Sequence, residues 1–310
     1  MNFDEYKLGK LDPKNFELYH LEKSASGEDG VTFILKDKDK NKFVFKIVPN
    51  KKHILLNFEN DVASKVPLFA RCYGETIFKI NRLPEEWREK IETKKQTINF
   101  GFTLYGYVYE YCDIKIEEWI KSKENQTTKK LAGILFEVLY ANYWAYYKSG
   151  GKYSHNDLHL DNIMLKSHKQ PREYTVGKNT FIVSGQPIVK IIDFDRVTKN
   201  ETTKKFVKGM RFFIKSLIKR NVFENWDKGQ EIANQVKTII KDKQSMEKTL
   251  TNEIFKTLIP EQESKKKRLK TTNCHICGGI AVRALENRPS LRFCLDDECV
   301  LKLGEIAHMI

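Results

Sequence analysis

Two short stretches of the chain place acidic and amide side chains directly beside runs of apolar residues. Tyr153–Lys166 contains Asp157 and Asn162, and Val189–Arg196 contains Asp193. Polar groups at the ends of buried strands are well placed to form a site. A carboxylate accepts the proton of an attacking hydroxyl, and Mg²⁺ prefers carboxylate, amide and phosphate oxygens. The pattern therefore predicts phosphoryl transfer, with Asp157 as the catalytic base and Asn162 and Asp193 as magnesium ligands.

The spacing H-x-D-x-x-x-x-N, followed by an apolar run and D-F, resembles the catalytic and metal-binding loops of the protein-kinase superfamily. The wording H-N-D-L-H-x-x-N-I-M together with K-I-I-D-F-D-R most resembles the serine/threonine protein kinases of large DNA viruses. The resemblance implies an α+β, bilobal protein-kinase-like fold with a small β-rich N-terminal lobe and a helical C-terminal lobe. It also implies transfer of the γ-phosphate of Mg-ATP to a protein hydroxyl.

Residues upstream resemble the nucleotide-binding part of the same superfamily. Gly27 and Gly30 take two positions of the glycine-rich loop, whose backbone N–H groups approach phosphates closely, and Ala25 takes the first position. Lys46 lies inside the apolar strand predicted for 42–48, where an ammonium group needs an anionic partner. It follows Gly30 by sixteen residues, close to the kinase spacing. The resemblance assigns Lys46 to the α- and β-phosphates of ATP.

A helix is predicted after this strand, over Ile54–Val66. Its apolar residues recur at helical spacing, at Leu55, Phe58, Val62 and Val66. By the same resemblance, a carboxylate on this helix is expected to pair with Lys46. Glu59 is the expected partner, and Asp61 is the alternative.

The segment Gly101–Asp113 is predicted to be a strand that leads into a hinge between the two lobes. It resembles the kinase linker, with Tyr109 as the residue before the hinge. The resemblance implies that Glu110, Tyr111 and Cys112 offer backbone groups to the adenine of ATP.

Three residues depart from the usual kinase pattern. His159 stands where most serine/threonine kinases have lysine, and we expect it near the γ-phosphate as a further catalytic residue with a pH-dependent charge. Asn156 replaces the arginine that commonly binds a phosphorylated activation loop, so regulation by that route is not expected. Asp195 replaces the glycine of the metal-binding loop, which predicts restricted backbone flipping there.

Two alternative functions are open, the first of them because of the sequence beyond Arg196. No A-P-E motif is present, and a helix is predicted soon afterwards from Phe206, so the peptide platform is shortened or absent. This also resembles choline-kinase-like and aminoglycoside-phosphotransferase-like enzymes, which phosphorylate small molecules. The insert Ser167–Gln186 resembles an extra hairpin of viral protein kinases and favours a protein substrate. A catalytically silent kinase-fold scaffold is the third candidate, although a scaffold needs no metal ligands.

Further helices are predicted from the spacing of apolar residues and from breakers. They comprise a short surface helix that begins at Pro84, a helix near Ile116–Trp119, a long helix over Thr127–Tyr147, and two helices within 225–260.

The length of 310 residues predicts about two domains, and a composition that is 40% hydrophobic is sufficient for a large buried core. The expected divisions are a leader 1–15, the N-lobe with hinge 16–112, the C-lobe 113–260, a basic linker 261–272 and a zinc-binding module 273–310. No apolar run is long enough to cross a bilayer and the first residues lack a signal-peptide layout. A cytoplasmic protein is therefore expected, in the host cytoplasm or a virion if the protein is viral.

Positive charge is concentrated in one part of the chain. Thr198–Lys270 has nineteen Lys or Arg against nine Asp or Glu, within a formal net charge of +14. Such a surface favours acidic proteins, nucleic acid or anionic lipid heads, and a solvated lysine-rich surface is the alternative. The run Lys265–Lys270 is interpreted as a tether, with nucleic-acid binding or nuclear targeting as alternatives.

Four of the six cysteines predict a structural zinc site near the C-terminus. Cys274 and Cys277 are separated by two residues, and Cys294 and Cys299 follow with four residues between them. Four thiolates complete a tetrahedral zinc site, and metal supplies much of the folding energy of so small a module. His275 or His308 could replace Cys299. Docking to a partner or nucleic acid, and capping of the kinase lobe, are both open as the role of this module.

Overall fold

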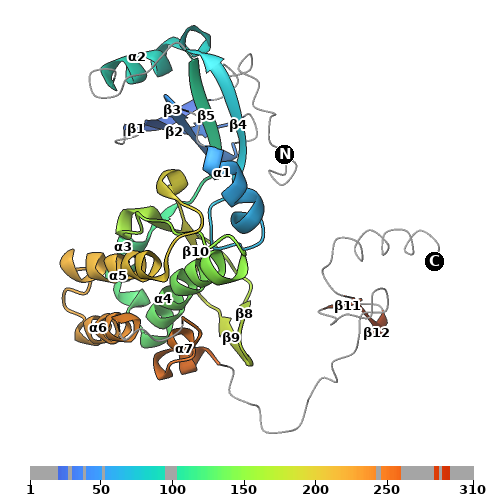
Figure 1. Ribbon diagram of the computed structural model, residues 1–310, viewed down its shortest axis with the longest axis vertical. Helices are drawn as coiled ribbons and strands as arrows, with labels where there is room; N and C mark the ends of the chain where they lie inside the picture. The colour runs from blue at the N-terminus through green and yellow to red at the C-terminus, as the bar shows by residue number, and fades with distance from the viewer. Residues whose placement is uncertain are drawn as a thin grey trace. The chain divides into compact units, whose positions relative to one another are not determined.

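The computed structural model describes residues 20–26, 30–37, 40–50, 53–94, 103–241, 246–259, 283–285 and 288–293. The chain divides into two compact units, Met1–Ile259 and Pro260–Ile310. The first is mixed α+β, with an N-terminal antiparallel sheet followed by helices, which confirms the predicted α+β class (Figure 1). Among the described residues, no helix has both the length and the apolar character needed to cross a membrane. The predicted leader, Gly27, the basic linker and the four zinc ligands lie outside the described residues.

The N-terminal sheet has five antiparallel strands in the order β1-β2-β3-β5-β4. The strands are β1 (His20–Ser26), β2 (Val31–Lys36), β3 (Lys42–Val48), β4 (Cys72–Lys79) and β5 (Thr103–Glu110). Because side chains alternate along β3, Phe43, Phe45 and Ile47 share one face. They belong to a hydrophobic cluster that Trp87 of α2 (Glu85–Lys94) completes by stacking on Phe33 at 5.3 Å. The predicted helix after Pro84 is therefore present, but its apolar side is buried on the sheet.

The segment after β3 forms a helix of two types. The α-helix α1 (His53–Phe58) continues as a π-helical turn, Glu59–Ala63. The four predicted apolar positions, Leu55, Phe58, Val62 and Val66, are all buried. They join a second hydrophobic cluster that includes most of the helical part of the unit. The predicted buried face is confirmed, whereas the π-helical turn was not foreseen.

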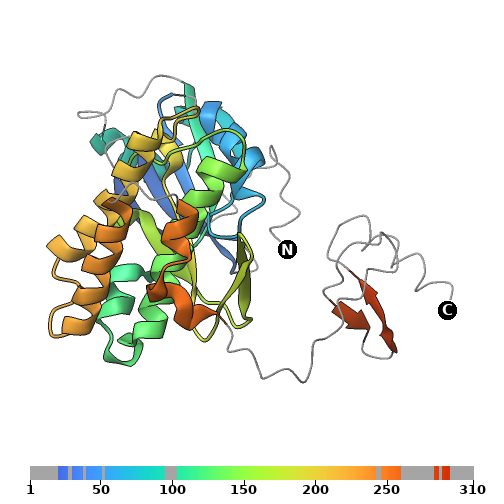
Figure 2. The same cartoon turned by 60° about the horizontal axis from the view of Figure 1, so that its bottom comes forward.

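The helical part follows β5. Its helices are α3 (Ile116–Lys121), α4 (Thr128–Tyr143), α5 (Thr203–Lys219), α6 (Asp227–Lys241) and α7 (Met246–Leu250), and α5 and α6 lie side by side (Figures 1 and 2). The Thr127 side chain caps α4 by accepting a hydrogen bond from the N–H of Lys130, and a π-helical turn extends α4 to Lys148. The predicted helices of this part are therefore confirmed.

Short strands cross the helical part. β6 (Ile114–Lys115), β7 (Ile163–Lys166) and β10 (Ile188–Ile191) form a three-stranded sheet, and β8 (Arg172–Val176) pairs with β9 (Asn179–Val183) as the predicted extra hairpin. Glu137 of α4 is fully buried and holds this hairpin. It accepts hydrogen bonds from Arg172 Nε at 2.6 Å, from Tyr174 Oη at 2.7 Å and from the N–H of Val189 at 3.0 Å. In the second unit, β11 (Arg283–Leu285) pairs antiparallel with β12 (Arg288–Phe293).

Candidate functional site

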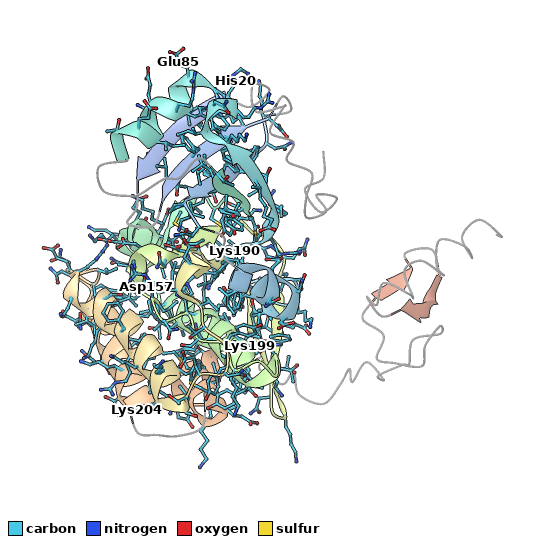
Figure 3. All side chains as sticks on the ribbon, turned by 45° about the horizontal axis from the view of Figure 1, so that its top comes forward. His20, Glu85, Asp157, Lys190, Lys199 and Lys204 are labelled. Atoms are coloured by element: carbon cyan, nitrogen blue, oxygen red, sulfur yellow. The ribbon has the colours of Figure 1, made fainter. Side chains whose placement is uncertain are left out.

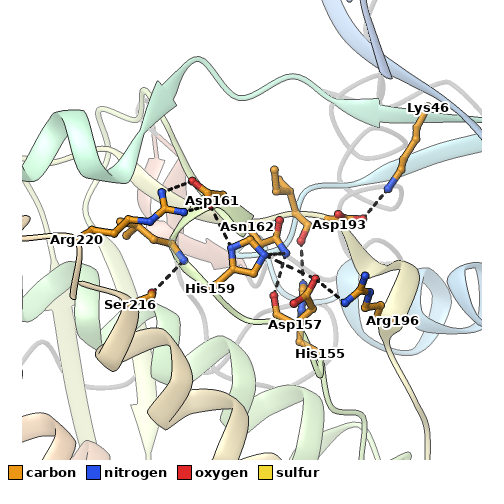
Figure 4. Close-up of polar contacts among 12 residues, drawn as sticks. Lys46, His155, Asp157, His159, Asp161, Asn162, Asp193, Arg196, Ser216 and Arg220 are labelled. Atoms are coloured by element: carbon orange, nitrogen blue, oxygen red, sulfur yellow. Dashed lines mark hydrogen bonds and ion pairs between the residues drawn. The ribbon is translucent and has the colours of Figure 1, made fainter. Parts of the chain in front are cut away.

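Two adjacent strands carry the two polar stretches that the sequence singles out. β7 and β10 pair antiparallel, with Ile163 opposite Ile191, so the loop before β7 lies beside the loop after β10. The N–H of Ile192 donates to the carbonyl oxygen of Asn162 at 3.0 Å and joins the two loops directly. His155 adds a second link, because its Nε2 lies 2.9 Å from the carbonyl oxygen of Ile192 (Figure 4). The structure thus brings together residues that are distant in sequence.

Both loops hold a non-glycine residue in the left-handed backbone region. Asn156 has φ 59° and Asp193 has φ 61°. Asn and Asp tolerate this conformation better than most residues, but it still costs energy relative to extended or helical backbone. Such conformations concentrate at sites where the surrounding structure fixes them. Asn156 directly precedes the predicted base Asp157, and Asp193 is itself a predicted magnesium ligand.

The loop before β7 orients Asp157, His159 and Asn162 toward one another. Asn162 Nδ2 donates to the carbonyl oxygen of Asp157 at 2.9 Å and lies 3.1 Å from His159 Nε2. His159 Nε2 is also 3.7 Å from Asp157 Oδ2, and Arg196 Nη1 is 3.8 Å from the same oxygen. Because the amide nitrogen of Asn162 is engaged with the loop, its oxygen lies on the opposite side of the amide. That oxygen is the atom suited to a cation.

Lys46 reaches this site from the sheet, on the β3 face opposite Phe45. Its Nζ lies 2.7 Å from Asp193 Oδ1 and 2.8 Å from Asp195 Oδ2. Burial alone would lower the pKa of Lys46, but the two carboxylates outweigh it and raise the pKa above its ordinary value. Burial alone would likewise raise the pKa of Asp193, but the ammonium group of Lys46 holds that pKa below its ordinary value. Lys46 and Asp193 are therefore both charged at neutral pH.

The predicted pair of Lys46 with Glu59 does not form, so that prediction is wrong for this structure. Glu59 instead accepts hydrogen bonds from Arg71 Nε and from the N–H of Cys72, the latter at 2.8 Å. The π-helical turn that begins at Glu59 directs its side chain to the start of β4. Burial raises the pKa of Glu59, although these two donors partly offset the effect. Asp61, the alternative, accepts from Tyr153 Oη at 2.6 Å.

A cleft of about 150 Å³ lies between the sheet and the helical part. Its lining combines apolar side chains with the charged and amide groups of the site: Thr32, Val44, Lys46, Ala70, Tyr109, Glu110, Asn162, Ile192 and Asp193. The cleft therefore gathers Lys46, Glu110, Asn162 and Asp193 of the predicted set. Cys112 is buried and does not line it. Gly30 packs on β3, where an added Cβ would lie 2.2 Å from the carbonyl oxygen of Ile47, so close packing already explains this glycine.

Glu110 has a role that the sequence did not reveal. Its buried carboxylate accepts from Lys166 Nζ at 2.7 Å and from Lys190 Nζ at 2.8 Å. Burial would raise the pKa of Glu110, but the two lysines outweigh it and lower the pKa. The sequence could have predicted an anionic partner for Lys190, because a lysine within an apolar strand needs one. The predicted hinge thus carries a buried ion-pair cluster beside the cleft.

The two described cysteines are free and buried. Burial raises the pKa of Cys112 to about 12 and that of Cys72 still further. Neither thiol is ionised near neutral pH, so neither is an effective nucleophile or metal ligand there.

Asn162 and Asp193 are the residues best placed to hold a divalent cation. Within the described ranges, no group of three or more His, Cys, Asp and Glu side chains is arranged to enclose a metal ion. Two protein oxygens supplemented by phosphate oxygens is the usual coordination of magnesium in nucleotide sites. Comparisons with protein-family models and with curated proteins find no match to this chain.

Proposed function

We propose that the protein is an ATP-dependent serine/threonine protein kinase, with a protein-kinase-like bilobal fold. The observation that carries the proposal is the convergence of Lys46, Asn162 and Asp193 on one cleft, directly beside Asp157. Lys46 and Asp193 are 147 positions apart in sequence yet lie 2.7 Å from each other. A cation-binding amide and carboxylate, a lysine from a facing sheet and a nearby carboxylate base are the parts that phosphoryl transfer requires.

Each residue then has a defined role. Lys46 orients the phosphates of ATP, and Asp157 accepts a hydrogen bond from the attacking hydroxyl and later its proton. Magnesium, held by Asn162 and Asp193, would neutralise the charge that develops on the phosphates. Most of the rate gain comes from alignment and charge neutralisation, because little covalent chemistry falls to the protein.

A small-molecule kinase is the second candidate, supported by one observation. Only Val197–Thr202 separates the loop after β10 from the start of α5, so the chain has little room there for a peptide platform. The β8–β9 hairpin, which resembles an insert of viral protein kinases, supports a protein substrate instead. A silent scaffold is the third candidate, and the left-handed backbone at Asp193 argues against it, since a scaffold has no need of that cost.

The deciding experiment follows labelled phosphate from Mg-ATP to acidic and basic proteins and to small amino alcohols. We expect label on serine or threonine with wild type, and a loss of at least 100-fold with Asp157→Asn or Asp193→Asn while thermal unfolding stays close to wild type. Glu224→Gln, an exposed acid-to-amide change on the same unit, serves as control and should keep full activity. Full activity in either Asp variant would refute the assigned roles.

The same experiment separates the alternatives. Label on the amino alcohols alone would favour a small-molecule kinase. If no label transfers but Mg-ATP raises the unfolding temperature, the scaffold is favoured, since a ligand at 100 times its Kd stabilises the folded state by about 2.7 kcal/mol. Lys46→Met should mainly weaken this stabilisation by Mg-ATP.

A further inference from the structure

The helix α5 presents a row of positive charges to solvent. Its basic side chains recur at steps of three and four residues and therefore lie along one face of the helix. They are Lys204, Lys208, Arg211, Lys215 and Lys219, here called the basic row. Lys204, at the N-terminal end of α5, is labelled in Figure 3. Within the described part of the chain none of these five makes an ion pair, whereas the neighbouring Lys205 pairs with Glu201 at 3.0 Å. Arg211 is half-buried, and its Nε has no hydrogen-bond partner there.

The neighbouring face of α5 is attached to the loop that carries Asp157. Ser216 Oγ accepts from the N–H of Leu160 at 3.1 Å, and Arg220 Nη1 donates to Asp161 Oδ1 at 2.6 Å (Figure 4). These contacts fix the helix against the catalytic loop. The basic row therefore has a defined position beside the site rather than lying on an independent surface.

Phe212 lies between the loop contacts and the basic row. It is 52% exposed and is one of three large hydrophobic residues in the described ranges that are exposed. Its ring is 6.4 Å from that of His159, and His159 is itself 3.7 Å from Asp157. On the helix surface Phe212 neighbours both Lys208 and Lys215, at steps of four and three. A ligand that extends from Asp157 along α5 therefore contacts the Phe212 ring first and then the basic row, whose charges no described ion pair neutralises.

We infer that α5 is the substrate-binding surface of the proposed kinase, and that the substrate is an acidic peptide segment with an apolar residue next to the phosphorylated serine or threonine. The inference rests on the proposed function. From Lys204 to Lys219 the row is about 22 Å long at 1.5 Å per residue, which matches roughly seven residues of extended peptide. A small amino alcohol is much shorter than this row. An apolar contact beside the base suits a side chain better than the phosphates of a nucleic acid.

The test compares two serine peptides of equal length, each with leucine beside the serine, one rich in Glu and the other with Gln at those positions. With the full chain at low salt, we expect kcat/KM to be at least tenfold higher for the acidic peptide. Lys208→Glu combined with Lys215→Glu should lower that ratio at least tenfold, and added salt should lower it as well. Lys90→Glu on α2, also exposed and helical, is the control and should keep the ratio.

Phe212 is tested separately. Phe212→Ala should raise KM for the acidic peptide with leucine at least threefold and leave KM unchanged for a version with glycine in that position. Circular dichroism melts would show that these surface variants fold.

Three outcomes would overturn the inference. Equal kcat/KM for both peptides with wild type refutes the acidic substrate and leaves the kinase proposal standing. The second outcome comes from anisotropy measurements of binding to the Asp157→Asn protein. If duplex DNA binds more tightly than the acidic peptide, and if that binding depends on the basic row, α5 is a nucleic-acid surface. No transfer to either peptide by wild type would refute the kinase proposal and the substrate assignment with it.

Discussion

At the scale of single residues, the feature that most distinguishes the site is the second carboxylate on Lys46. The side chain of Asp195 is 2% exposed and its Oδ2 lies 2.8 Å from Lys46 Nζ, while Glu59 is engaged by Arg71. A buried ammonium needs a permanent counter-charge, because an uncompensated buried charge costs several kcal/mol. In the proposed mechanism Asp193 would hold the metal. Asp195 then remains as the residue that positions Lys46.

This assignment predicts a difference between two isosteric changes. Asp195→Asn should lower kcat/KM for Mg-ATP at least tenfold, equivalent to about 1.4 kcal/mol of transition-state stabilisation, because Lys46 loses its buried partner. Glu59→Gln should lower it less than threefold, because Glu59 supports Arg71 and β4 rather than Lys46. Steady-state kinetics at varied Mg-ATP measure both. A larger loss with Glu59→Gln would restore the helix carboxylate as the partner of Lys46.

His155 predicts a pH dependence of folding. Burial of the ring lowers its pKa below the ordinary value of 6.5, despite its hydrogen bond to Ile192. As the pH falls below 6.5 the unfolded chain takes up a proton that the folded chain does not, so the free energy of unfolding decreases; above 6.5 both states are neutral and the effect vanishes. We expect a loss of up to about 1.4 kcal/mol per pH unit as the pH falls below 6.5.

Urea unfolding at several pH values measures this slope. The variant His155→Gln keeps a donor near the carbonyl of Ile192 and does not titrate. It should show a shallower slope than wild type over the same range, whatever its absolute stability. Equal slopes would assign the acid sensitivity to other groups.

The residues of the site were predictable to different degrees for physical reasons. Asp157, Asn162 and Asp193 stand out because polar groups next to apolar strands have few structural explanations. Glu59 was misassigned because the direction of a helical side chain depends on the turn type, and a π-helical turn leaves no mark in apolar spacing. Lys190 was missed although the argument applied to Lys46 fits it equally.

At the scale of elements, apolar periodicity located most helices of the first unit, because their buried faces are nearly continuous. It identified α1 and α5 by their buried positions, whereas the β8–β9 hairpin was predicted from the resemblance of the insert to viral protein kinases. It did not reveal what holds elements together. The contact of α4 with the hairpin depends on Glu137 and Arg172, which are 35 residues apart in sequence, and long-range pairs of this kind carry no local signal.

This contact predicts a large stability effect. Glu137→Leu leaves the buried guanidinium of Arg172 without its carboxylate, and removal of one partner of a buried pair typically costs about 3–5 kcal/mol. The exposed pair Lys228–Glu231 on α6 is the matched control: Lys228→Ala should cost less than about 1 kcal/mol. Urea unfolding compares the two. Similar small losses would show that the hairpin does not depend on this ion pair.

At the scale of the whole molecule, the two units predict two separable properties. We expect metal analysis to find one zinc per chain, and Cys274→Ser with Cys277→Ser to abolish it, because four thiolates are needed to close the site. Stabilisation of the first unit by Mg-ATP should persist in that variant, since Met1–Ile259 has its own hydrophobic clusters. Zinc retained at full stoichiometry would contradict the assigned ligands.

The burial of Cys72 and Cys112 gives the native protein a selective response to electrophiles. With pKa values raised to about 12 or beyond, these two thiols should resist iodoacetamide and maleimides at neutral pH, where only thiolates react quickly. Of the six cysteines, this leaves four as targets, all in the second unit. Intact-mass spectrometry of an alkylated sample therefore separates two events: up to four adducts would report loss of the predicted zinc, and a fifth or sixth would report opening of the unit that contains the cleft.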